Sequence, residues 1–291
     1  MRRFAVLLPL SLLLGGCVAT SGSGRTQFVA PQPIGAAYSE ASLQRSLLLS
    51  DTRACRPDTC GAVAAFNRRL LYVGERLVRA AADEVREQPI PRVDIRLLDT
   101  TEHGTASSAA GTVVVHGGTR ELDPGEPALA FLLAREIGHV IAGHHHEDSA
   151  TNLAFSIVGT LLLPVGNILR GAAAALTASD GIAAATTAAS YLGASAYKAT
   201  YRADQLREAD LLALQLATRA GWSLEEIAES LAAVAPRLRD EGWSGELLVS
   251  KVRLDQMTAG PPWPLDEPPA AVAVVQAPAP ITPSTTFTRS P

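Results

Sequence analysis

Aromatic residues are scarce in this sequence, and neither sign of charge dominates it. Phe, Trp and Tyr make up 5% of the 291 residues, and 25 basic side chains stand against 29 acidic ones, for a formal net charge of −4. Such a balance provides no broad cationic surface for nucleic-acid phosphates, so we expect no nucleic-acid partner. The texture rich in Ala and Gly favours helices packed through small residues and argues against an all-β fold.

An apolar run opens the chain but is too short to span a bilayer. Two arginines precede this run, residues 4–14, and a small-small-cysteine junction ends it at Cys17. The pattern resembles a bacterial lipoprotein signal peptide over residues 1–16, which implies that Cys17 is lipidated; an ordinary secretory signal with an incidental cysteine is the alternative. Because Val18 is not the aspartate associated with inner-membrane retention, we expect lipid anchoring at the outer membrane, on its periplasmic face.

Cysteine is rare, with three residues in all, and two of them lie close together. An exported chain enters an oxidising compartment, so Cys55 and Cys60 are predicted to form a small disulfide loop, with two free thiols as the alternative. A redox or metal role is less favoured, because the spacing differs from the two intervening residues of thioredoxin-like sites.

Composition predicts one folded region between two flexible ones. Residues 17–44 are rich in Ser, Gly, Thr and Pro and predict a flexible tether, and the proline-rich residues 261–291 predict a disordered tail. The folded domain is therefore expected over residues 45–260.

Hydrophobic periodicity predicts the elements of that domain. Apolar residues at three- and four-residue steps indicate a helix over residues 63–77, and short apolar runs indicate strands at 93–97 and 113–115. Ser223 and Glu226 form a capping box that begins another helix. The apolar positions of a last helix are Leu247, Val249, Val252 and Leu254. We therefore expect an α+β, mostly helical fold with a small β-sheet.

The helix that follows the strands carries the first chemical motif, Arg135 to His139. It has the layout of a His-Glu-x-x-His zinc-peptidase helix, in which two histidines bind zinc and the glutamate activates a water molecule. Here Arg135 stands in place of the first histidine. Taken alone, Glu136 and His139 are explained as well by a helical charge and a buried, hydrogen-bonded histidine.

A second segment, residues 201–210, favours the zinc-peptidase interpretation of the first motif over the two simpler explanations. Together the two segments resemble the HtpX and CAAX-prenyl-protease type of zinc metallopeptidases, metallopeptidase family forty-eight, and most closely its BepA-like branch of periplasmic lipoproteins. The resemblance implies a zincin-like (gluzincin) fold, with Glu136 at the general-base position and His139 as a zinc ligand. It also implies that Asp210 supports the ligands and that Leu206 replaces the third ligand, a glutamate.

Two of the three family ligands are thus replaced by groups that cannot hold zinc. The guanidinium of Arg135 stays protonated and repels a divalent ion, and Leu206 has no lone pair to donate. We therefore expect no zinc cofactor and an idle Glu136. In place of the metal, we expect Arg135 to form an ion pair with Asp210 or Glu208.

Three consecutive histidines after the motif leave an alternative open. On a regular helix His146 lies too far beyond His139 to share one ion with it, but a break at Gly143 would fold residues 144–146 back toward the site. Such a rewired metal site would make the protein an active zinc metalloendopeptidase of envelope quality control. A solvated helix end and adventitious metal binding are the other interpretations.

Residues 151–200 form an apolar insertion rich in Ala and Gly, which the resemblance places over the cleft. Its first part, residues 151–169, has no charged residue but contains Pro164. A transmembrane hairpin, a broken helix that touches the membrane and two closely packed buried helices all remain possible.

Taken together, these features predict a lipid-anchored periplasmic pseudopeptidase. Its expected partners are unfolded or assembling envelope proteins, together with the membrane that holds its lipid. We expect an extended client to add to the edge of the small sheet, and the resemblance places the strand at 113–115 beside the substrate cleft.

Overall fold

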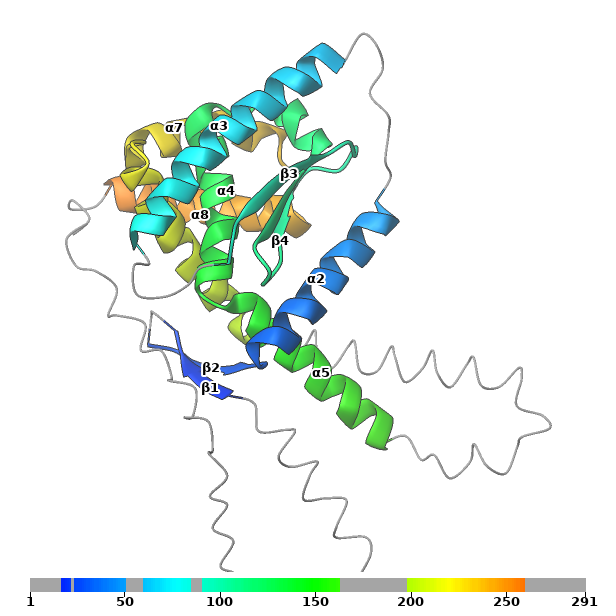
Figure 1. Cartoon of the computed structure of the whole chain (residues 1–291). Helices are drawn as coiled ribbons and strands as arrows, with labels where there is room; N and C mark the ends of the chain where they lie inside the picture. The colour runs from blue at the N-terminus through cyan, green and yellow to red at the C-terminus, as the bar shows by residue number, and fades with distance from the viewer. Residues whose placement is uncertain (1–16, 22–23, 51–59, 85–90, 163–197, 260–291) are drawn as a thin grey trace, which may run out of the picture.

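The computed structural model describes residues 17–21, 24–50, 60–84, 91–162 and 198–259 (Figure 1). The predicted signal peptide, Cys55, the insertion beyond residue 162 and the C-terminal tail lie outside the described residues, so those predictions remain open.

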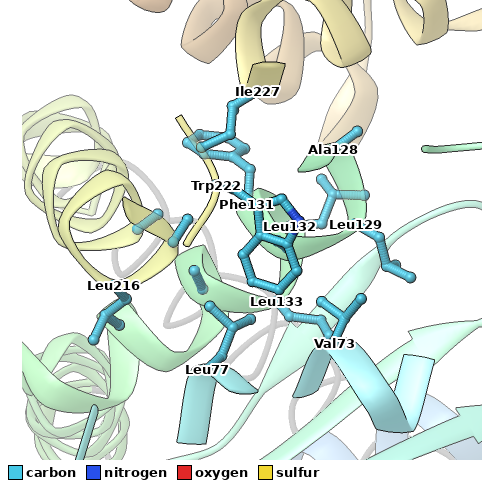
Figure 2. Packing of buried hydrophobic residues seen from close by; sticks show 14 of the residues in the cluster. Val73, Leu77, Ala128, Leu129, Phe131, Leu132, Leu133, Leu216, Trp222 and Ile227 are labelled. Atoms are coloured by element: carbon cyan, nitrogen blue, oxygen red, sulfur yellow. The ribbon is translucent and has the colours of Figure 1, made fainter. Parts of the chain in front are cut away.

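Helix α4 (Glu126–Ile141) lies at the centre of the domain, and all its residues from Ala128 to Val140 are buried. Most of these residues are apolar and they lie all around the helix, so other elements must surround it. Helix α3 (Cys60–Glu84) and helix α7 (Leu224–Val234) pack against α4, and the helix of residues 198–219 adds apolar side chains to the same core. Figure 2 shows this packing around Phe131, Trp222 and Ile227.

Helix α3 confirms the helix predicted from the apolar spacing over residues 63–77. Its buried face includes Phe66, Leu70, Val73 and Leu77. Its first residue, Cys60, is disulfide-bonded. The pairing of Cys60 with Cys55 stays a prediction, because Cys55 lies outside the described part of the chain.

A three-stranded sheet lies beside α4, with the strand order β3-β5-β4. Strands β3 (Asp94–Leu98) and β5 (Thr112–His116) are parallel and confirm the two predicted strands, whereas β4 (Thr105–Ser107) runs antiparallel to β5. The placement of the strand at 113–115 along the cleft is wrong, because β5 is the central strand and β4 forms the edge that contacts α4.

The predicted flexible tether over residues 17–44 is also wrong. Strands β1 (Cys17–Thr20) and β2 (Thr26–Val29) form an antiparallel hairpin, and α2 (Gln32–Leu49) packs along α5 (His144–Leu162). The buried side of α2 consists of Gly35, Ser39 and Leu43. Small residues give no apolar periodicity, yet they allow close approach: a Cβ at Gly35 would clash with Nδ1 of His146.

Both C-terminal helices form as the sequence predicts, but two residues assigned to the buried face of the second are exposed. Ser223 and Glu226 form the predicted capping box at the start of α7. Helix α8 (Gly242–Ala259) buries Leu247, Ser250 and Leu254. Val249 and Val252 are exposed, so their assignment to the buried face is wrong; the seven-residue step from 247 to 254, two helical turns, defines that face.

Within the residues that the structure describes, no helix combines the length and the apolar character needed to cross a bilayer.

Candidate functional site

The helical path is interrupted between α4 and α5 at Gly143, which adopts a left-handed conformation with φ of 71°. The break turns His144 and His145 back toward the motif helix, whereas the ring of His146 lies against α2. His144 Nδ1 lies 2.9 Å from His139 Nδ1, and the two rings meet edge to face. With only 1% of its surface exposed, His144 cannot belong to a solvated helix end, so that interpretation is wrong for this residue.

His144 also connects the motif helix to the second motif segment. Its Nε2 lies 3.3 Å from Oε2 of Glu208, which is itself buried. Burial and the neighbouring charges of His144, His145 and Arg135 lower the pKa of His139 well below its ordinary value. Burial likewise lowers the pKa of His145 to about 4. His139 and His145 are therefore neutral at pH 7.

The carboxylate of Glu136 is held by two hydroxyl groups of strand β4. Thr105 donates to Oε1 at 2.7 Å and Ser107 donates to Oε2 at 2.6 Å, while the indole of Trp243 donates to Thr105 Oγ1 at 3.1 Å. Ser107 Oγ also lies 2.8 Å from His145 Nε2. Glu136 thus fastens α4 to the edge strand, and both its oxygens already accept hydrogen bonds.

Arg135 is the largest fully buried side chain of the described residues, with 1% of its surface exposed. Its Nη1 donates to Ser250 Oγ at 3.4 Å, and its guanidinium carbon lies 6.0 Å from the centre of the Trp243 ring. Its Nε is buried and finds no hydrogen-bond partner within the described part of the chain.

The predicted ion pair of Arg135 with Asp210 or Glu208 is not formed. Helix α8 supplies the partners of Asp210 instead: Arg253 forms the ion pair, and Ser250 donates to Oδ1 at 2.9 Å. Ser250 thus stands between Arg135 and Asp210 and links them indirectly. Arg253 lies outside both motifs, so the sequence pattern offered no reason to weigh it against Arg135.

Asp210 has none of its surface exposed, and burial raises its pKa to about 6, although the nearby guanidinium groups of Arg135 and Arg253 act to lower it. Its ordinary value is 3.8, so the folded state binds more protons than the unfolded state between these two values. The contribution of Asp210 to stability is therefore fully present below about pH 4 and lost as the pH rises through about 6.

We predict that this loss amounts to about 3 kcal/mol of unfolding free energy. Urea denaturation of the wild type and of Asp210→Asn, at about pH 4 and about pH 7, measures it, because other titrating groups cancel in the comparison. The variant should gain stability relative to the wild type at the higher pH. An identical difference at both pH values would show that Asp210 has an ordinary pKa.

A cavity of about 330 Å³ opens between β4, α4 and α8. Its lining includes the side chains of Thr105, Ser107, Arg135, Glu136, His139, Trp243 and Glu246. A second cavity of about 240 Å³ lies between α2 and α5 and shares Ala106, Ser107, His145 and Asp148 with the first. The two cavities thus follow the edge strand on the side away from β5.

Sequence reasoning missed Thr105 and Ser107 of β4, as well as Trp243, Ser250 and Arg253 of α8. Thr105 and Ser107 lie in a three-residue strand, which is too short to show an alternating pattern. The local sequence before β5 shows only a run rich in Gly and Ser over residues 104–111, which is typical of a bend.

Residues 73–264 match the sequence model of peptidase family M48. The match covers about two thirds of the chain and includes α4 and the helix of residues 198–219. The chain therefore belongs to peptidase family M48. A search of curated proteins finds no match.

Zinc, the metal that the resemblance implies, does not fit the side chains gathered here. Among the described residues, no three His, Cys, Asp or Glu side chains are grouped so that they could hold a metal ion. A buried guanidinium lies at one expected ligand position and the buried hydrocarbon of Leu206 at another, and neither has a lone pair to donate.

Proposed function

We propose that this member of family M48 is a zincin-like pseudopeptidase, which keeps the family's cleft for binding and has lost its chemistry. The observation that carries the proposal is the burial of the Arg135 guanidinium in the motif helix, at the position of a zinc-binding histidine. A fixed cation at this position repels a divalent ion, and arginine does not deprotonate in proteins.

The environment of Glu136 supports the loss of catalysis. A general base has to accept a proton from a water molecule, yet both oxygens of Glu136 accept short hydrogen bonds from Thr105 and Ser107. The carboxylate therefore serves to join α4 and β4. This role explains why a glutamate is present although two of the three zinc ligands are replaced.

The edge of strand β4 that faces away from β5 supports client binding. His116 donates its backbone N–H to Gly104, and Ser108 donates to Thr112. In an antiparallel ladder this alternation turns the backbone groups of residues 105 and 107 away from β5, toward the cleft. An extended segment of an unfolded or assembling envelope protein can pair with such an edge, with side chains in the two cavities.

The periplasmic, lipid-anchored location belongs to the same proposal. It rests on the lipobox, the small-small-cysteine junction that ends at Cys17, and on the disulfide-bonded state of Cys60, since disulfides persist in oxidising compartments.

An active zinc endopeptidase with a rewired site is the second candidate. The approach of His144 to His139 favours it, because two imidazoles at that separation lie in the range of neighbouring metal ligands. Against it, His144 and His139 contact each other directly, and His144 also contacts Glu208. We therefore favour the pseudopeptidase.

The test combines cleavage with binding. Casein and an unfolded outer-membrane protein should be cleaved no faster by the wild type than by Glu136→Gln. The wild type should nevertheless bind the unfolded protein, and Ala106→Asp should weaken binding about tenfold, about 1.4 kcal/mol, by placing a charge in the cavity wall. Binding is measured by fluorescence anisotropy of the labelled client.

Tyr72→Asp, on the exposed side of α3, is the matched control and should bind as the wild type does. Cleavage that Glu136→Gln abolishes and a chelator inhibits would establish the second candidate instead. Equal binding by all three proteins would remove β4 as the client site.

A further inference from the structure

The β1-β2 hairpin has one covered face and one exposed face. Ala19, Gln27 and Val29 lie on the covered face. On the opposite face, the cross-strand partners Val18 and Phe28 are exposed by 61% and 37%. Two apolar side chains therefore lie side by side on the outside of the molecule, flanked by the exposed pair Thr20 and Thr26.

The covered face is fastened to the junction of α4 and α5. Gln27 Nε2 donates to the carbonyl oxygen of Ala142 at 3.4 Å, and the N–H of Ala30 donates to the carbonyl oxygen of His146 at 3.1 Å. Arg25 adds a bidentate ion pair to the buried carboxylate of Glu147, at 2.6 and 2.8 Å. The hairpin is thus part of the folded domain.

Because the hairpin is part of the folded domain, the predicted lipidation site at Cys17 lies directly beside that domain. Strand β1 begins at Cys17 itself, whose register partner is Val29, so no tether separates the predicted lipid anchor from the folded domain. A lipid on Cys17 would bring the end of the hairpin down to the bilayer surface. The residue next to the anchor is Val18, and its exposed partner is Phe28.

We propose that the hairpin face of Val18 and Phe28 is a membrane-seating surface that enters the bilayer interface beside the lipid of Cys17. This inference rests on the lipid anchor of the proposed function. Residues 17–29 contain no acidic side chain, so anionic headgroups do not repel the surface. In the view of Figure 1 the hairpin lies at the lower left of the molecule, beside the start of α5 and away from α3 and α7.

Seating the hairpin places the cleft close to the membrane. The covered face contacts the backbone of Ala142 and His146, on either side of the break that brings His144 and His145 to the cleft. Only the thickness of a packed sheet, about 10 Å, separates these residues from the bilayer surface. The cleft can therefore receive segments of proteins that are assembling at the same membrane.

Photocrosslinking of the full-length, lipidated protein in phosphatidylethanolamine/phosphatidylglycerol vesicles tests the proposal. Phe28 is replaced by p-benzoylphenylalanine, an aromatic for an exposed aromatic, and Tyr72, 51% exposed on α3, receives the same replacement as a matched control. After irradiation, mass spectrometry should find lipid adducts at position 28 and none at position 72. With Cys17→Ser in addition, the adducts at position 28 should be lost.

The outcomes distinguish a failure of the membrane-seating surface from a failure of the proposed lipid anchor. A lipidated protein that floats with the vesicles but gives no lipid adduct at position 28 overturns the membrane-seating surface and leaves the anchor intact. A protein without lipid on Cys17, with vesicle binding unchanged by Cys17→Ser, overturns the anchor and this inference together. Equal adducts at positions 28 and 72 would show unspecific contact and also overturn it.

Discussion

Replacing Arg135 by histidine and Leu206 by glutamate in the same chain is expected to create a zinc site that the wild type lacks. The double variant would place three donors around the cleft, namely the two introduced side chains and the existing His139, and three protein ligands are what a catalytic zinc needs. We expect about one zinc ion per chain after dialysis, measured by mass spectrometry of the metal content. A chelator should remove it.

Single variants provide the control for this result. Arg135→His alone and Leu206→Glu alone should retain far less zinc, because each leaves one ligand missing. Arg135→His with Leu214→Glu is the matched control, since Leu206 and Leu214 lie on the same helix and each has 7% of its surface exposed. Equal zinc in this control would mean that position 206 does not face the site.

Removing the buried side chain of Arg135 is expected to lower the unfolding free energy by about 2 to 5 kcal/mol at pH 7, the cost of emptying a fully buried side-chain volume. Arg135→Ala opens a cavity beside His139 and withdraws one of the two guanidinium groups that lower the pKa of Asp210. Arg135→Met keeps most of the packing and removes the buried charge, so it should cost under about 1.5 kcal/mol. Urea denaturation measures both variants.

Arg207→Ala is the matched surface control. Arg207 pairs with Asp204 at 3.1 Å, and both side chains are largely exposed, so its loss should cost less than about 1 kcal/mol. If Arg135→Ala falls within the same range, the guanidinium adds nothing to the fold, and the motif has decayed without a replacement.

Strong periodicity and capping chemistry made part of this fold predictable. Helix α3 follows from apolar residues on one side, and the start of α7 follows from the reciprocal bonds of Ser223 and Glu226. The motif of α4 and the segment at 201–210 identified the family. In each case the signal lies within one element, where local spacing determines the result.

The remaining features depend on contacts between elements far apart in the chain. Helix α2 packs through Gly35 and Ser39, which carry no hydrophobic signal, and β4 is too short for a pattern. The partner of Asp210 is Arg253, 43 residues away on a different helix. The sequence thus named Asp210 as one of two candidate carboxylates, with Glu208, but assigned it the wrong cation, Arg135 instead of Arg253.

The metal content of the purified wild-type protein tests the central claim most directly. The lipidated chain is loaded with excess zinc, dialysed against metal-free buffer and analysed for bound metal beside the double variant Arg135→His, Leu206→Glu. A buried guanidinium in the motif helix predicts that the wild type retains no stoichiometric zinc. One tightly held zinc ion per wild-type chain, lost on His139→Ala, would contradict the pseudopeptidase account.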